Sequence, residues 1–336
     1  MFHYITLLAV LCSLAATAGN IQPVLRTTSE LNNGVLASPQ IGSSFDIKAT
    51  LVEKNQVNLT FQDAFGASCA STHDENICHL KGENGNLIRV RGYIAYENRF
   101  QHACAICTNL TILDKGSPTP PLKANVPELL SGKFDFRLVS FKGTVRNLST
   151  DEIDTRFVFL LVDGDGATIP AVLSPNDSID DNIPIGSLVE ITGICNFGDN
   201  SVRRMPGRMV TTHNLTVLSR PEDPFNAPSL GDLRQLIPAE IAALGRRRVT
   251  GVVLTAFSGN RFVIRSDNEF IHTVQLSSGP SPSAGDFVTA VGYPESDLYH
   301  THLTHAIWRR ERTGTVPADQ SSAVNVKDIL KDHTGH

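Results

Sequence analysis

The sequence predicts an all-β protein made of tandem five-stranded barrels joined by short helices. Three observations carry this prediction: short alternating segments rich in Val, Ile, Leu, Phe and Thr, turn residues between these segments, and repetition of the whole pattern. Glycines in corresponding segments recur at intervals of about 100 residues along the 336-residue chain. This length is sufficient for two or three ordinary domains.

The N-terminus has the features of an export signal. Residues 5–16 are mostly apolar but too few to span a bilayer comfortably, and Ala16-Thr17-Ala18 fits the small-x-small cleavage pattern. We therefore expect residues 1–18 to be a signal peptide and the mature protein to be periplasmic or extracellular. Contact with a membrane would come only through a segment downstream of this chain.

The first unit, residues 19–121, is a divergent copy of the repeat that carries most of the cysteines. Its predicted strands are residues 45–53, 57–63, 87–94 and 108–115. A cysteine-bearing segment, residues 69–78, stands where a clean third strand is expected.

Four cysteines of this unit are disulfide candidates, because cysteines of exported proteins are expected to pair. They are Cys69, Cys78, Cys104 and Cys107. Zinc is an alternative, since His73, His79 and His102 lie nearby, and a redox pair at the C-x-x-C is another. Zinc sites typically contain two pairs of closely spaced ligands, and Cys69 and Cys78 are too far apart in the sequence to be the second pair. Disulfides are therefore favoured, and no metal or cofactor is expected.

The second unit, residues 122–226, shows the repeat most clearly. Its predicted strands are residues 136–148, 157–163, 167–173, 185–197 and 213–220, and Cys195 is expected in the core. Asp163-Gly164-Asp165-Gly166 lies between the second and third strands. A calcium loop would need about twelve ligand-spaced residues between helices, so a tight hairpin, whose residues tolerate positive φ, is the favoured interpretation.

The third unit, residues 227–317, repeats the same order. Its predicted strands are residues 247–257, 261–267, 270–276, 284–293 and 305–311. Lead-in segments with apolar residues at helical spacing precede the second and third units, at residues 124–136 and 229–247. Residues 318–336 resemble these lead-in segments, and we expect them to be the lead-in of a truncated further unit.

Glycines in the first and fourth strands of the units favour one kind of barrel. Gly143, Gly193, Gly251 and Gly292 permit the sharp coiling that closes a small barrel. Five antiparallel strands in about 90 residues suit the oligonucleotide/oligosaccharide-binding (OB) barrel. The fold class that the sequence predicts is therefore a set of OB-like barrels.

The order of these motifs also resembles the extracytoplasmic OB-like repeats of bacterial sensor histidine kinases. The residues that carry the resemblance are Leu233-Arg234-Gln235-Leu236, Val249-Thr250-Gly251, Phe262-Val263-Ile264, Gly285-Asp286-Phe287-Val288 and Gly292 in the third unit, and Phe141-Lys142-Gly143, Gly186-Ser187-Leu188-Val189, Gly193 and Arg220-Pro221 in the second. The resemblance covers roughly residues 19–317. It implies the sensing region of a two-component system, non-catalytic as given, because a kinase core would lie downstream.

A second class of function stays open beside the sensor. The chain could be a stand-alone secreted or periplasmic OB-fold protein that binds carbohydrate, peptide or, less favoured, nucleic acid. The net charge of -5 and the 7% aromatic content argue against a nucleic-acid partner. No motif for nucleophilic, metal-dependent or phosphate-loop catalysis occurs, so no catalytic residue and no enzyme activity are predicted. The partner is an unknown ligand or protein.

The sequence places its candidate ligand site in the third unit, in the loop between the fourth and fifth strands. OB barrels often bind ligands through this loop. The candidate residues are Tyr299, His300, His302 and Trp308, since the two rings could stack on a sugar or a base. A metal site that adds His305 is the alternative, and an exposed binding loop is favoured over it.

Overall fold

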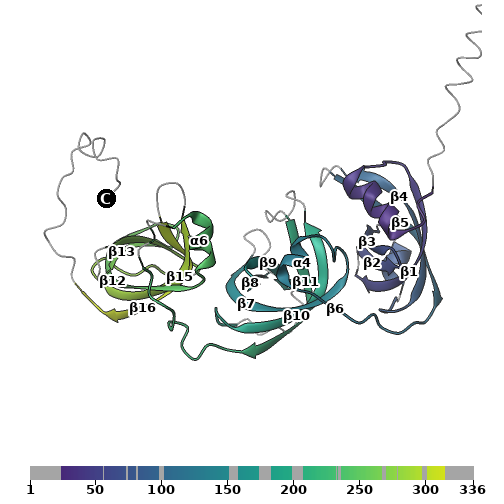
Figure 1. Cartoon of the computed structure of the whole chain (residues 1–336). Helices are drawn as coiled ribbons and strands as arrows, with labels where there is room; N and C mark the ends of the chain where they lie inside the picture. Colours follow the sequence, from purple (N-terminus) through teal and green to yellow (C-terminus); the bar gives the residue numbers. More distant parts are fainter. Residues whose placement is uncertain are drawn as a thin grey trace, which may run out of the picture. The chain divides into compact units, whose positions relative to one another are not determined.

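A computed structural model describes most of the chain between residues 24 and 314. The described residues are 24–55, 57–72, 75–80, 82–97, 102–150, 158–173, 183–198, 207–231, 233, 236–266, 270–277, 279–296 and 301–314. Their strands form two closed five-stranded barrels and, between these in the sequence, a six-stranded sheet (Figure 1). This confirms an all-β fold of OB-like barrels. The predicted signal peptide and the predicted truncated unit lie outside the described residues.

The first barrel contains five strands in the order β1-β2-β3-β5-β4, closed by pairing of β1 with β4. The strands are β1 (Ser44–Lys54), β2 (Asn58–Asp63), β3 (Gly66–Ser71), β4 (Leu87–Glu97) and β5 (His102–Asp114). The helices are α2 (Thr28–Asn32), the π-helix η1 (Asn33–Ala37) and α3 (Glu75–His79). Alternate residues of β1 point inward, and Phe45, Ile47 and Leu51 share one core with Leu31 of α2.

Helix α2 begins where a local sequence signal places it. Thr27 and Glu30 form a capping box, in which the Thr27 side chain accepts a hydrogen bond from the Glu30 backbone N–H. The Glu30 carboxylate in turn accepts one from the Thr27 N–H. The cap holds this five-residue helix against the barrel, where Leu31 is fully buried.

The first barrel differs from its prediction in two strands. The third strand is present, as β3, and was hidden because Gly66, Ala67 and Ala70 have weak strand propensity. The fifth strand begins at His102 rather than at residue 108, so the C-x-x-C lies inside β5.

The predicted disulfides are not formed among the described cysteines. Cys69, Cys104, Cys107 and Cys195 are thiols, and the Cys78 side chain lies outside the described part of the chain. Cys104 pairs with Ala95 and Cys107 with Gly92 in one regular ladder. Three residues along a strand span about 10 Å, which exceeds the reach of a disulfide between Cα atoms. The extended backbone therefore excludes a Cys104–Cys107 bond.

The second sheet has the strand order β10-β11-β9-β8-β7-β6, and β10 also pairs with β7. Its elements are β6 (Leu122–Lys123), α4 (Val126–Leu130), β7 (Leu138–Thr150), β8 (Val158–Gly164), β9 (Ala167–Leu173), β10 (Leu188–Gly198) and β11 (Gly207–Ser219). Because β10 pairs with β7, the strands β7 to β11 close in the cyclic order β7-β8-β9-β11-β10, which is the order of the first barrel. Cys195 is fully buried, as predicted.

The turn at Asp163-Gly164-Asp165-Gly166 is a two-residue hairpin between β8 and β9, as predicted. Gly164 pairs with Ala167, which leaves Asp165 and Gly166 as the loop residues. Their φ angles are +50° and +80°. Positive φ at both positions is the geometry of a type I′ turn, which explains the Asp-Gly sequence without a calcium ion.

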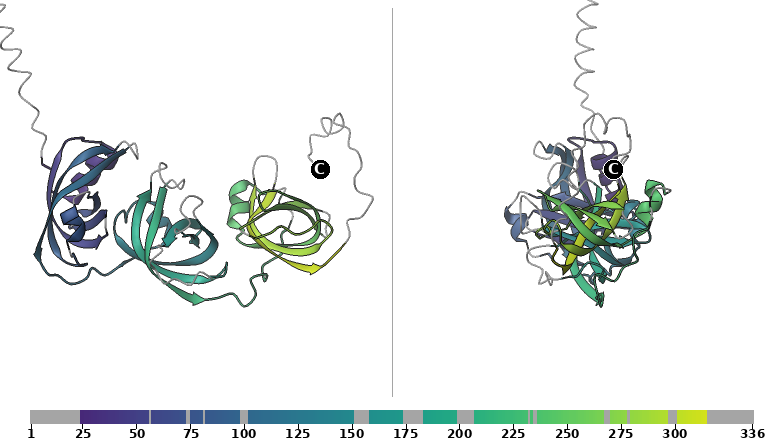
Figure 2. Two further views of the ribbon diagram at one scale, coloured as in Figure 1. Left: turned by 180° about the vertical axis from the view of Figure 1, so that it is seen from behind. Right: turned by 90° about the vertical axis from the view of Figure 1, so that its left-hand side faces the viewer.

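The third barrel repeats the closed order, here β12-β13-β14-β16-β15 (Figure 2, green to yellow). Its elements are α6 (Pro238–Ala243), β12 (Arg247–Phe257), β13 (Arg261–Ser266), β14 (Ile271–Leu276), β15 (Phe287–Ser296) and β16 (Thr301–Arg312). The helix within the predicted lead-in is short, because Pro238 stands at its start and Ser229 instead bridges to Arg248. Leu230, Leu233 and Ile241 nevertheless pack into the core.

The repeated glycines occupy positions where two backbones approach closely. A Cβ atom built on Gly92 would collide with the carbonyl oxygen of Ile106, and one on Gly251 with that of Arg265. Only glycine lets the neighbouring strand come so near. The regular spacing of these residues in the sequence thus reflects a steric requirement of barrel closure.

In the described part of the chain, no helix has the length and apolar character needed to cross a membrane.

Candidate functional site

The clearest candidate site is a groove on the outside of the first barrel. Residues from the start of α2, from β1, from the β2–β3 hairpin and from β4 surround a volume of about 470 Å³. We call it the basic groove; its lining residues are Arg26, Thr27, Asp46, Lys48, Asp63, Ala64, Phe65 and Arg89. The volume lies within the usual range for small-molecule sites, about 300–1,000 Å³.

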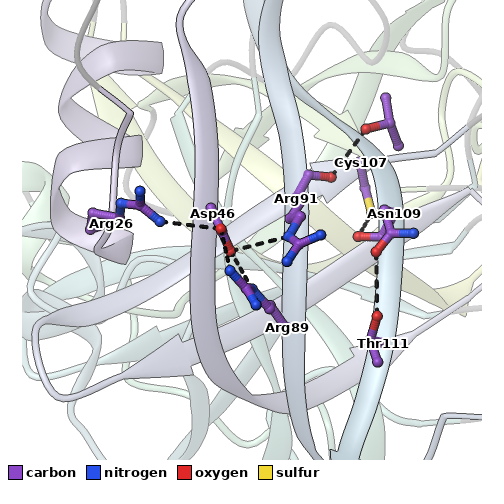
Figure 3. A network of polar contacts seen from close by, with 8 residues as sticks. Arg26, Asp46, Arg89, Arg91, Cys107, Asn109 and Thr111 are labelled. Carbon is purple, nitrogen blue, oxygen red and sulfur yellow. Dashed lines mark hydrogen bonds and ion pairs between the residues drawn. The ribbon is translucent and has the colours of Figure 1, made fainter.

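Asp46 pairs with three arginine side chains that form a cluster beside the groove (Figure 3). Arg89 donates to both of its carboxylate oxygens, from Nε to Oδ1 and from Nη2 to Oδ2, each at 2.6 Å. Arg26 Nη1 lies 3.1 Å and Arg91 Nε 3.5 Å from the same carboxylate. The hydrogen bond from Arg89, followed by the charges of the three guanidinium groups, lowers the pKa of Asp46 to about 2.

The strand register places Lys48 directly opposite Arg89, and Asp46 directly opposite Arg91. The Asp46–Arg89 contact is therefore diagonal across β1 and β4. Among the described residues, no carboxylate is paired with the Lys48 ammonium group. The bidentate contact with Asp46 offsets the charge of Arg89 and, with it, the repulsion that directly opposed like charges would otherwise exert.

Asp63 closes the other side of the groove and organises the β2–β3 hairpin. Its Oδ1 accepts hydrogen bonds from the backbone N–H groups of Phe65 (2.7 Å) and Gly66 (3.0 Å). The Thr28 hydroxyl donates to Oδ1 at 2.6 Å, and the Thr28 N–H donates to Oδ2 at 2.8 Å. These four contacts fix the hairpin relative to α2 and engage the Asp63 carboxylate within the protein.

Phe65 stands at the tip of this hairpin with 69% of its surface exposed. It is a lining residue of the basic groove, together with its neighbour Ala64. An exposed ring held by a rigid turn is able to stack on a flat ligand group. The groove thus combines positive charge with one aromatic surface.

At the position of Arg89 the other two units are not basic. Three residues before the fourth-strand glycine, the first unit has Arg89, the second has Glu190 and the third has Thr289. The Ser140 hydroxyl contacts Glu190 at 3.5 Å, and the hydroxyl oxygens of Thr250 and Thr289 lie 3.1 Å apart. The shared scaffold therefore does not require a cation at the Arg89 position, whereas Lys142 of the second unit occupies the position of Lys48.

The hairpin position of Phe65 differs in the second unit as well. Phe65 is the second residue after Asp63, and the second residue after Asp163 is Asp165. The Asp163 carboxylate also serves a local role, because its Oδ1 accepts a hydrogen bond from the Thr168 hydroxyl at 2.6 Å. Both strand-end aspartates thus organise their hairpins, and of these two hairpins the first presents a ring.

Of the four predicted ligand-binding residues of the third unit, the structure describes His302 and Trp308, and these two lie apart. Tyr299 and His300 lie outside the described residues. His302 lies on β16 with its Nε2 3.9 Å from Glu295 Oε2. Trp308 packs against the barrel core, and its Nε1 donates to the carbonyl oxygen of Pro280 at 2.9 Å. His302 pairs with Glu295 and Trp308 with Ala290, so about 17 Å of strand separates them.

The described residues contain no group of three or more His, Cys, Asp or Glu side chains placed to hold a metal ion. The basic groove was missing from the sequence prediction because its residues come from four separated segments. One signal was available, namely comparison of the repeats, in which Glu190 and Thr289 correspond to Arg89.

Comparison with known proteins adds little. No family model and no curated protein matches the chain. Among solved structures, an aspartyl-tRNA synthetase from Entamoeba histolytica is 18% identical over 32% of this chain and 25% of its own, with a TM-score of 0.26. A murine DNA-binding protein bound to double-stranded DNA is 9% identical over 53% and 98%, with a TM-score of 0.30.

A third similar structure is the second OB-fold domain of replication protein A from Methanococcus maripaludis. It is 12% identical to this chain over 30% of this chain and 100% of its own, with a TM-score of 0.20. Likenesses of this size carry no argument about function. The chain spans about a quarter of the length of the synthetase.

Proposed function

We propose that this chain is a non-catalytic binding protein that holds an anionic ligand in the basic groove of its first barrel. The observation that carries the proposal is an excess of cations on one face, where the single carboxylate of Asp46 pairs with the guanidinium groups of Arg26, Arg89 and Arg91. Lys48, opposite Arg89 on the neighbouring strand, is exposed beside them. A bound anion would supply the negative charge that this face lacks.

The charges that line the groove support the same conclusion. Arg26, Lys48 and Arg89 contribute three positive charges, against the two carboxylates of Asp46 and Asp63. Asp63 is occupied by four internal hydrogen bonds. Asp46 is shared among three guanidinium groups. The lining therefore keeps a net charge of about +1, and Arg91, which also contacts Asp46, adds a further positive charge beside it.

The proposal is tested by calorimetric titration of the full chain with tripolyphosphate at low salt. We expect saturable binding that weakens at least about tenfold in Lys48→Ala, a loss of about 1.4 kcal/mol or more. Lys115→Ala is the matched control, because Lys115 is exposed on the same barrel outside the groove. Absence of binding, or equal weakening in both variants, contradicts the proposal.

We extend the proposal to sensing, with the groove as the input site of a two-component sensor histidine kinase. The sequence resemblance of the second and third units supports this extension. It is tested by reading the DNA downstream of codon 336 for a membrane helix and a kinase core. A stop codon with no kinase downstream would instead favour a stand-alone exported binding protein with the same groove.

A further inference from the structure

Phe65 is the feature of the basic groove that a simple anion does not explain. Large apolar side chains are expected in the core, whereas tight turns usually contain small or polar residues. Here the ring is 69% exposed, and it lines the same groove as the cations. The ring therefore offers apolar surface where the ligand is expected to lie.

The hairpin holds the backbone of Phe65 in place before any ligand arrives. The backbone N–H of Phe65 is bound by Asp63 Oδ1, and Asp63 is itself tied to Thr28 of α2. Neither Ala64 nor Phe65 has a positive φ, so the turn carries no backbone strain at these residues. A preorganised aromatic side chain loses little entropy when a flat group stacks on it.

The cations lie on the same groove, in reach of a ligand that covers the ring. Lys48 is exposed on β1, and the Arg26 side chain is 60% exposed at the start of α2. Arg89 belongs to the same lining and is held by Asp46. A ligand that stacks on Phe65 would thus find positive charge along one side.

We propose that the ligand of the basic groove is a single strand of nucleic acid, with a base stacked on Phe65 and backbone phosphates on Arg26 and Lys48. This inference rests on the proposed function. A ring beside cations is the combination by which proteins bind single strands without sequence preference. The exposed lining favours a chain that passes along the surface over a small molecule enclosed in a pocket.

A sulfated polysaccharide is the competing polyanion. Its charges would satisfy Lys48 and Arg26, but its saturated rings would pack on Phe65 only through C–H groups, whereas a base offers a flat π-face. The nucleic-acid proposal departs from the expectation drawn from the net charge of -5. That charge belongs to the whole chain, whereas the cations of the first barrel are concentrated on β1, β4 and the start of α2.

The test is fluorescence anisotropy of the full chain with a labelled oligothymidylate of about 12 nucleotides, within the span of one OB-type barrel. We expect Phe65→Ala to weaken binding about tenfold or more, because stacking on one base contributes that much. Phe257→Ala is the matched control, since this ring is 51% exposed on the third barrel. Lys48→Ala should weaken binding and lower the slope of log K against log salt by about 0.7.

Unlabelled heparin and tripolyphosphate are run as competitors in the same assay. Oligothymidylate binding that depends on both Phe65 and Lys48 supports the inference. If heparin binds through Lys48 and Phe65→Ala has no effect on either polyanion, the proposed function stands and the nucleic-acid ligand is refuted. If no polyanion binds, or Lys48→Ala changes nothing, the proposed function itself is refuted.

Discussion

Replacing Asp46 by Asn separates the structural role of the arginine cluster from its role in binding. The pKa of Asp46 falls from an ordinary 3.8 to about 2, which limits the stabilisation to about 2.5 kcal/mol. Solvent screening of partly exposed ion pairs reduces this to about 1 kcal/mol. Because the folded pKa is depressed, the contribution is present above pH 3.8 and is lost as the pH falls towards 2.

The same substitution should strengthen anion binding. The Asp46 carboxylate competes with a ligand for the guanidinium groups of Arg26, Arg89 and Arg91. Removing it adds one net positive charge beside the groove. At a surface site this is worth about 1 kcal/mol, or about a fivefold gain in affinity for tripolyphosphate. Stability and binding are therefore expected to change in opposite directions.

Hydrogen exchange of the full chain, read by mass spectrometry, measures the stability change locally. In Asp46→Asn, peptides covering β1 and β4 should exchange about fivefold faster at pH 7, whereas those of the third barrel should not change. Asp114→Asn, an exposed carboxylate at the end of β5, is the charge-matched control. Unchanged exchange in β1 and β4 together with weaker anion binding would refute the reasoning.

Three further predictions concern the barrels themselves. Gly251→Ala should destabilise the third barrel by about 1–3 kcal/mol, because the added Cβ would meet the Arg265 carbonyl. Gly231→Ala is the control and should be neutral, because the space around Gly231 is open. Fluorescence of the single tryptophan during denaturation measures the stability of both variants. Burial raises the pKa of the Cys69 thiol from 9.0 to about 11, so iodoacetamide at pH 8 should alkylate it about a hundredfold more slowly in the native than in the denatured chain, as peptide mass spectrometry would report. Burial lowers the pKa of His272 below 6.5, so the stability it contributes is present above pH 6.5 and is lost as the pH falls, and His272→Leu should remove part of that acid sensitivity in the same tryptophan assay.

The barrel fold was predictable because its requirements recur in the sequence at fixed positions. Backbone approach demands glycine at Gly92 and Gly251, and a type I′ turn demands Asp165-Gly166. The third strand of the first unit escaped prediction because small residues such as Ala67 can line a barrel without strong strand propensity. The C-x-x-C was misread because β5 extends further back than its alternating core pattern indicated.

The site was harder to predict than the fold because its parts meet only in three dimensions. Arg26, Lys48, Phe65 and Arg89 belong to four segments, and each looks like an ordinary surface residue in its own segment. They come together only through the register of β1 and β4 and the position of the β2–β3 hairpin. A comparison of corresponding strand positions among the three units would have singled out this face as the unusual one.

The central claim is that the basic groove of the first barrel is the ligand site, and a hydrogen-exchange footprint of the full chain tests it most directly. With saturating oligothymidylate or tripolyphosphate, the claim predicts slower exchange in peptides that cover β1, β4 and the β2–β3 hairpin. Exchange elsewhere should be unchanged. Protection confined to the second or third unit, or none at concentrations where binding is detected, would contradict the claim.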